Sequence, residues 1–225
     1  MKMLLYIFCI VAVTAMTSCQ PYKTITSSYI QAYYVPTGLT TDTQINPNDM
    51  EIEVTVKGSL EYFVYVGGEK KNIYNKYANY NGDTNYQRDE DNWGGPISSC
   101  NPLSSISVTC NADWDAAHPA GTSLNDLFSV KVGSARKYIE SNYKVNDYSV
   151  CSSKLSELKY TDIQPFTDWI VIYTSSKPEM AGLYELTIRV EFEKDPINGN
   201  SVSCEPAKVK VEFYLKKMPN FKTYF

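Results

Sequence analysis

Three stretches of alternating or apolar sequence predict an all-β fold for this chain of 225 residues. Residues 51–56 alternate charged or polar side chains with β-branched ones, as in a strand with one buried face. Residues 168–173 form an apolar run that is typical of a central strand. Residues 183–192 and 208–213 alternate again and flank a loop rich in turn residues, which predicts a terminal hairpin.

The other elements are predicted from shorter patterns. Alternation indicates a first strand beginning within 29–35, and residues 60–66 resume the strand that residues 57–59 break. Further strands are expected at 103–109 and 127–132. Short helices or helical turns are expected at 123–126, 135–141 and 153–159.

Residues 69–99 differ in composition from the rest of the chain. They contain few aliphatic side chains, many Asn and Tyr, and a Gly-Gly-Pro end. A structureless segment of this length is uncommon in a compact domain and is usually functional or mobile. We therefore expect a long Tyr/Asn-rich insertion in the β domain.

The terminal hairpin carries the residues of a more specific resemblance. The sequence Gly-Leu-Tyr-Glu-Leu at 182–186 resembles the penultimate strand of an immunoglobulin-like domain. In that fold a Tyr turns its hydroxyl back to the backbone, two residues before a core Cys. Tyr184 matches this Tyr, Leu186 takes the Cys position, and Trp169 is the candidate for the buried core Trp. The resemblance covers 103–215 and implies an immunoglobulin-like β-sandwich without the cysteine pair between the sheets.

The N-terminus predicts a targeting signal. Lys2 precedes an apolar run at 4–16, which is too short for a stable membrane span, and Thr-Ser-Cys follows at 17–19. This pattern resembles a bacterial lipoprotein signal, in which a peptidase cuts before a diacylglycerylated Cys. The resemblance makes 1–18 the signal peptide and Cys19 the lipid anchor in the bilayer. The alternative is an ordinary cleaved signal with an incidental Cys.

The outer membrane is the expected location, because Gln20 stands where a common inner-membrane retention signal has Asp. Both its periplasmic and its outward face stay open as alternatives. Residues 19–48 are expected to be a polar tether that includes the first strand, and 49–225 a single β-sandwich domain.

Composition and motifs exclude several classes of function. Lys and Arg number 21 against 25 Asp and Glu, whereas nucleic-acid-binding proteins usually carry a basic surplus. At 43% hydrophobic and 20% charged residues, the chain is neither disordered nor an integral membrane protein. No Walker loop or G-x-G-x-x-G motif supports nucleotide chemistry.

Four cysteines follow the anchor, and an oxidising compartment favours disulfides. A strand at 103–109 would hold Cys100 and Cys110 about 25–30 Å apart, beyond the ~7 Å that a disulfide allows. Two pairings remain, and we expect Cys110–Cys204 with Cys100–Cys151. The rival interpretation, a zinc site, lacks a C-x-x-C pair.

Catalysis is not expected. His118 is the one imidazole available as a base, and no G-x-S-x-G motif lies near it. We expect a turn residue that packs against Trp114, with a hydrolase as the remote alternative. Acidic pairs such as Asp113 and Asp115 lie in expected loops, which favours solvated acids over a glycosidase pair.

Calcium is the metal with most support, because it takes oxygen ligands at alternate loop positions. Asp83 lies in one such Asn/Asp series at 79–85, and Asp113 and Asp115 lie in another at 111–115. Neither series matches the EF-hand, and Asn/Asp clusters are ordinary turn formers. Turns are the favoured interpretation, and no other cofactor is expected.

The main sign of a binding surface is aromatic. Flat apolar rings with a polar handle suit sugars or partner proteins, and five of them lie in the insertion. They are Tyr74, Tyr77, Tyr80, Tyr86 and Trp93. The opposite interpretation, which the cost of exposed aromatic clusters slightly favours, is that several fold back as core.

We therefore expect a membrane-anchored, non-enzymatic binding or adhesion lipoprotein for a glycan or an envelope protein. The alternative is a structural or accessory subunit of an outer-membrane complex. The lipoprotein signal, the Tyr-rich tether, the segment His-Pro-Ala-Gly-Thr-Ser-Leu-Asn-Asp-Leu-Phe at 118–128 and the terminal hairpin together resemble an uncharacterised lipoprotein family of gut Bacteroidetes. That family has no established activity, so the resemblance implies no ligand.

Overall fold

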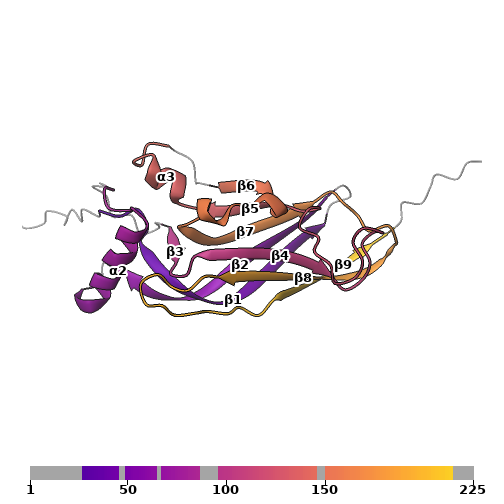
Figure 1. Ribbon diagram of the computed structural model, residues 1–225, viewed down its shortest axis with the longest axis horizontal. Coiled ribbons are helices and arrows are strands. Elements are labelled where there is room, and N and C mark those ends of the chain that lie inside the picture. Colours follow the sequence, from indigo (N-terminus) through magenta and orange to yellow (C-terminus); the bar gives the residue numbers. More distant parts are fainter. Residues whose placement is uncertain (1–26, 46–48, 65–66, 87–95, 146–149, 215–225) are drawn as a thin grey trace, which may run out of the picture.

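The computed structural model describes residues 27–45, 49–64, 67–86, 96–145 and 150–214. These residues form two β-sheets, one over the other, with the helices α2 (Gly68–Tyr80) and α3 (Arg136–Glu140) at one end of the molecule (Figure 1). The expected all-β class is confirmed. Residues 1–18, where we predict a signal peptide, and the candidate residues Cys19 and Trp93 lie outside the described residues.

The larger sheet has six strands. They are β1 (Ala32–Ile45), β2 (Met50–Phe63), β3 (Ile97–Ser99), β5 (Ser129–Ser134), β6 (Val150–Lys154) and β7 (Phe166–Thr174). Their order is β3-β1-β2-β7-β5-β6, and all pairs are antiparallel except the short β3, which runs parallel to β1. The apolar strand expected at 168–173 is thus β7, which is central as predicted. Strand β1 takes up much of the segment that we expected as a tether.

The smaller sheet has three antiparallel strands, β4 (Leu103–Cys110), β8 (Gly182–Phe192) and β9 (Ala207–Phe213), in the order β4-β8-β9. The expected terminal hairpin is β8–β9. Side chains cover the outer edge of β4. The Val108 amide donates to Oδ1 of Asn125 (3.0 Å) and the Ile106 amide to Oη of Tyr160 (2.8 Å). These bonds occupy backbone donors that another strand would need for pairing.

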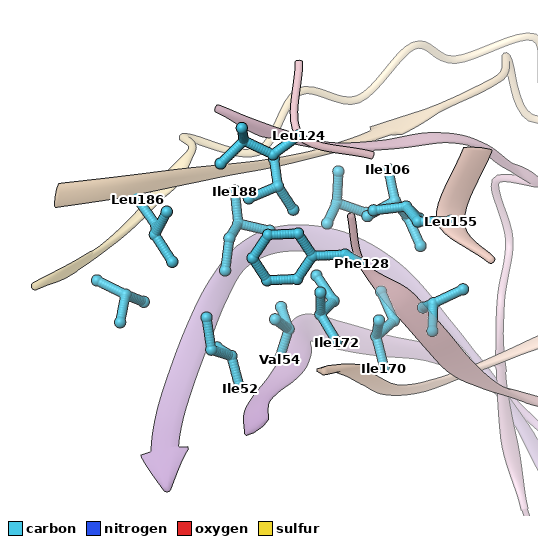
Figure 2. Packing of buried hydrophobic residues seen from close by; sticks show 14 of the residues in the cluster. Ile52, Val54, Ile106, Leu124, Phe128, Leu155, Ile170, Ile172, Leu186 and Ile188 are labelled. Atoms are coloured by element: carbon cyan, nitrogen blue, oxygen red, sulfur yellow. The ribbon is translucent and has the colours of Figure 1, made fainter. Parts of the chain in front are cut away.

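The main hydrophobic core lies between the two sheets (Figure 2). Ile52 and Val54 point into it from β2, as the alternation at 51–56 predicts, and Ile170 joins them from β7. Ile106 of β4 and Ile188 of β8 face them from the smaller sheet. Burial of this apolar surface stabilises the stacked arrangement by roughly 25 cal/mol for each Å² removed from water.

Strand β2 runs through the break that we predicted at 57–59, so that prediction was wrong. A Cβ atom on Gly58 would lie 2.2 Å from Cδ2 of Tyr34, on the neighbouring strand β1. Glycine is needed here so that the Tyr34 ring can lie against the backbone of β2. The pairing of β1 with β2 shifts register on either side of this contact, which lets the strand continue past the glycine.

The insertion at 69–99 is not structureless, because it begins with the helix α2. The buried residues of α2 are Tyr74, Tyr77 and Ala78, which are spaced three and four apart and so share one face. They pack on a second core that includes Ile30 and Tyr33. The helix is missed in the sequence because its buried face is built from tyrosine, which the polar neighbours conceal.

The short helix expected at 135–141 is α3, and the other two expected helices are formed only in part. Residues 123–126 form a turn, and 153–159 divide between the end of β6 and a 3₁₀ turn at Leu155–Glu157. A second 3₁₀ turn spans Tyr160–Asp162. Among the described residues, no helix has the length and apolar character needed to cross a bilayer.

The predicted backbone contact of Tyr184 is confirmed, since its Oη donates to the carbonyl oxygen of Met180 at 2.8 Å. The prediction for the core tryptophan was wrong. Trp169 is half-buried, and its Nε1 donates to Oε1 of Glu53. Trp114, from the loop after β4, is the fully buried one, with its ring 5.9 Å from that of Tyr184.

Replacement of Tyr184 by phenylalanine is expected to lower the free energy of unfolding by about 1 kcal/mol, the typical net value of one hydrogen bond. The ring stays in the core, so the change isolates the bond to Met180. Urea denaturation measures the effect, and Tyr80→Phe, at an exposed position, serves as the control. Equal stability of the two variants would show that the bond contributes nothing.

Candidate functional site

A cleft of about 620 Å³ opens at the end of the molecule where α2 and α3 lie. Its walls come from segments far apart in the sequence. They are the C-terminal end of α2, the start of β4, α3, the segment at 160–164, and Glu193 just beyond β8. The volume lies within the ~300–1,000 Å³ range of small-ligand sites.

The end of α2 positions the first wall. The Gly82 amide donates to the Asn79 carbonyl and the Asp83 amide to the Ala78 carbonyl, which is the Schellman arrangement for ending a helix. Gly82 has a φ of +68°, a left-handed conformation that favours glycine. This sharp end brings Tyr80 and Asn81 to the cleft, and the Tyr80 side chain is 50% exposed.

Helix α3 supplies a charged wall. Nε of Arg136 donates to Oε1 of Glu140 at 2.8 Å, one helical turn away, and the same guanidinium donates to the carbonyl of Thr161. Arg136 therefore ties α3 to the 160–162 turn and keeps a planar ion pair at the cleft. Glu193 adds a second carboxylate to the lining.

Two side-chain amides form a chain from the cleft into the second core. Nε2 of Gln164 donates to Oδ1 of Asn81 (3.4 Å), and Nδ2 of Asn81 donates to Oη of Tyr33 (3.3 Å). Oε1 of Gln164 is buried and has no hydrogen-bond partner within the described residues. Because buried polar atoms are nearly always bonded, this unpartnered oxygen makes Gln164, a residue of the cleft lining, a candidate binding group.

Tyr160 fixes the 160–164 wall to the sandwich. Its Oη accepts a hydrogen bond from the Ile106 amide of β4 at 2.8 Å. Burial raises the pKa of this phenol above its ordinary value, so the hydroxyl stays protonated at neutral pH. The wall is thus rigid at the point where Gln164 enters the cleft.

The aromatic residues that we singled out do not act together as a surface. Tyr74, Tyr77 and Tyr86 are buried, at most 8% exposed, and Trp93 lies outside the described residues. Tyr77 stacks on Tyr33 with ring centres 4.9 Å apart, and its Oη donates to Oδ2 of Asp195 at 2.5 Å. The core interpretation holds for these three rings, and Tyr80 alone lines the cleft.

Asp83 is a buried brace that holds the backbone at 29–30. Its two carboxylate oxygens accept the backbone amides of Tyr29 and Ile30, both at 2.8 Å, and the hydroxyl of Tyr143 at 2.9 Å. Burial raises the pKa of this carboxyl, and the three hydrogen bonds oppose that shift. Among the described residues, no group of three His, Cys, Asp or Glu could hold a metal ion.

The loop after β4, which includes the second candidate calcium series at 111–115, instead holds His118 between two carboxylates. Nδ1 of His118 lies 2.7 Å from Oδ1 of Asp115, and Nε2 lies 3.0 Å from Oδ2 of Asp126. Oδ1 of Asp113 accepts the Ala120 amide at 2.7 Å. His118 is therefore a turn residue, as expected, although the side chain is clamped by acids, and its contact with Trp114 is a backbone hydrogen bond.

The clamp predicts a specific pH dependence of stability. Hydrogen bonds to Asp115 and Asp126 raise the pKa of His118, so this contribution is complete below its ordinary value of 6.5 and is lost as pH rises through the folded pKa. The bond to His118 lowers the pKa of Asp115, so its contribution is lost as pH falls below 3.8 through the folded pKa.

We expect His118→Gln to destabilise the protein most at about pH 5 and least at about pH 9. Urea denaturation of both proteins across this range measures the difference in the free energy of unfolding. A difference that is the same at every pH would contradict an ionised clamp.

The four cysteines that we expected to pair are free thiols in the structure. Cys100 precedes β4 and belongs to the second core, whereas Cys110 is the last residue of β4 and belongs to the main core. Cys151 donates to the carbonyl of Asp162 at 3.5 Å. Neither Cys110–Cys204 nor Cys100–Cys151 is formed. Burial raises the pKa of the Cys100 thiol to about 12, so it is unreactive in the folded protein.

Sequence reasoning missed most of the cleft. Arg136, Glu140, Gln164 and Glu193 belong to no motif, and only the fold brings them beside Tyr80. Comparisons with protein-family models, with curated proteins and with solved structures found no match to the chain. The functional argument therefore rests on the geometry of the cleft.

Proposed function

We propose that this protein is a non-enzymatic lipoprotein of the bacterial envelope, anchored through acylated Cys19, which binds its ligand in the cleft between α2 and α3. The observation that carries the proposal is the exposed ring of Tyr80 in this cleft, next to a lining residue, Gln164, whose buried Oε1 has no partner among the described residues. A ligand would cover the first group and satisfy the second.

We further propose that the domain is an immunoglobulin-like sandwich. The series β1-β2-β7-β5 has the connectivity of strands A, B, E and D, and β4-β8-β9 that of C, F and G. The hydroxyl contact of Tyr184 supports the same assignment. In this scheme β3 and β6 are additions, and α2 lies in the connection between B and C.

The position of the cleft also supports a binding role. Rigid β-sandwiches commonly bind their ligands with the loops at one end of the strands. Here the cleft walls are connections and helix ends, which strands β4 and β8 hold in place. The lining offers stacking and hydrogen-bonding groups and includes no nucleophile next to a base.

Two measurements test the proposal. Cells producing the full chain should carry it in the outer-membrane fraction, and Cys19→Ser, which removes the residue that must be lipidated before the cut, should leave the protein unprocessed and outside that fraction. The anchor would be refuted if both proteins stayed in the cytoplasm, or if the variant had the same distribution among cell fractions as the unmodified chain.

The cleft is tested with a soluble Cys19→Ser protein, produced from residue 19 onward without the signal peptide, in a thermal-shift screen of sugars, amino acids and short peptides. A true ligand should raise the melting temperature of this protein but not that of a variant with Thr161→Trp added, which fills the cleft. Thr40→Trp, on exposed β1, is the matched control and should respond normally. An equal response of all three proteins would place the ligand elsewhere.

A further inference from the structure

We infer that the ligand of the cleft is a neutral oligosaccharide, with one pyranose ring stacked on Tyr80 and one sugar hydroxyl donating to Oε1 of Gln164 after the amide of Gln164 turns toward the cleft. This inference rests on the proposed function and names the substrate class of the same site. Three properties of the cleft support it: an exposed aromatic face, a set of planar polar groups, and the sign of the charge.

The aromatic face is the exposed ring of Tyr80. The other described tyrosines of α2, Tyr74 and Tyr77, are 1% exposed and fill the second core. Tyr80 instead stands at the last residue of the helix and borders the cleft. A flat ring beside a polar cleft matches a pyranose, which has an apolar C–H face and a rim of hydroxyl groups.

The polar side chains that line the cleft are of the kinds that bind sugar hydroxyl groups. A sugar hydroxyl both donates and accepts, so it can be held between an acceptor and a donor in one plane. Gln164 provides the unpartnered acceptor, Glu193 a further carboxylate, and Arg136 with Glu140 an adjoining donor and acceptor.

The charge of the lining favours a neutral ligand over an acidic one. Arg136 is the one cation among the described lining residues, and Glu140 already binds it at 2.8 Å. Glu193 leaves the cleft with a negative balance, which would repel a phosphate, a sulfate or a uronic acid. The hydroxyl-rich surface of a neutral sugar meets no such penalty.

The volume sets the length of the oligosaccharide. A cavity of about 150 Å³ holds one benzene ring, and the cleft measures about 620 Å³. A pyranose with its hydroxyl groups is larger than benzene, so the cleft has room for about two or three sugar rings.

Calorimetric titration of the soluble Cys19→Ser protein tests the inference directly. The probes are neutral trisaccharides of glucose, mannose, galactose and xylose, with trigalacturonic acid and a lysine-containing tripeptide for comparison. We expect saturable binding of at least one neutral trisaccharide and none of the acidic sugar.

Four variants then locate the binding. Tyr80→Ala should weaken it about tenfold or more, as expected for loss of one stacked ring, and Tyr80→Trp should keep it. Gln164→Leu should weaken it about tenfold, because it removes the acceptor. Tyr214→Ala, at an exposed ring outside the cleft, should leave the affinity unchanged. Circular dichroism confirms that each variant is folded.

The outcomes separate this inference from the proposed function. Tripeptide or acidic-sugar binding that Thr161→Trp abolishes would overturn the inference and leave the cleft as the ligand site. Neutral-sugar binding that survives both Tyr80→Ala and Gln164→Leu would overturn the inference as well. If no probe binds and the thermal-shift screen finds no ligand of the cleft, both proposals fail.

Discussion

Replacement of Asp83 by alanine is expected to lower the free energy of unfolding by about 3–5 kcal/mol. The carboxylate is fully buried and accepts the amides of Tyr29 and Ile30 together with the hydroxyl of Tyr143. Alanine would remove the acceptor that these three donors share. Urea denaturation, with the slope checked for two-state behaviour, measures the loss.

Asp83→Asn is the informative companion, because one amide oxygen can still accept a backbone donor while its NH₂ group faces the other. We expect it to lose about half as much stability as the alanine variant. Asp113→Ala should lower the free energy of unfolding less than either variant, because Asp113 is a more exposed loop residue that accepts one hydrogen bond from the Ala120 amide. A loss below about 1 kcal/mol for Asp83→Ala would show that the brace is not needed.

Replacement of Trp114 by alanine should lower the free energy of unfolding by about 3–5 kcal/mol, as for other fully buried aromatic residues. Its ring lies 5.5 Å from that of Phe213 and 6.2 Å from that of Phe128, between the sheets. Its Nε1 donates to Oγ of Ser176 at 3.1 Å, so the polar end is also satisfied.

Trp169→Ala is the matched control, since the sequence pattern favours Trp169 as the core tryptophan. Trp169 is half-buried and bonds Glu53 at the surface, so we expect a loss of about 1 kcal/mol or less. A larger effect at Trp169 than at Trp114 in thermal or urea denaturation would contradict the assignment of the core.

Strands with strict alternation could be predicted because their pattern reflects one local cause. At 51–56 every second residue faces the core, and Ile52, Val54 and Val56 are buried in the structure. Tyr184 was found for a similar reason, since its contact with Met180 spans four residues. Such short-range relations are present in the sequence itself.

The features that could not be predicted depend on contacts over long separations. The continuity of β2 at Gly58 is explained only by the Tyr34 ring that lies against it. Helix α2 is stable because Tyr74 and Tyr77 find a second core, in which Tyr77 bonds Asp195, 118 residues away. Tertiary packing decides such cases against local preference.

The same reason explains the candidate site. Of the five aromatic residues considered for binding, Tyr80 is exposed because α2 ends there, which the sequence shows only as Gly82. The Gln164 side chain is held by a hydrogen bond from its Nε2 to Asn81, 83 residues away, while its Oε1 has no partner among the described residues. No local pattern marks this pair.

The central claim is that the cleft between α2 and α3 is the ligand site. Amide chemical shifts of the ¹⁵N-labelled Cys19→Ser protein, followed during titration with the neutral trisaccharide that binds best, test it most directly. We predict that the largest changes fall at 80–82, 136–140 and 160–164. Residues 115–126, which contain the His118 clamp and do not line the cleft, should show none. Largest changes outside the cleft, or no changes at saturation, would contradict the account.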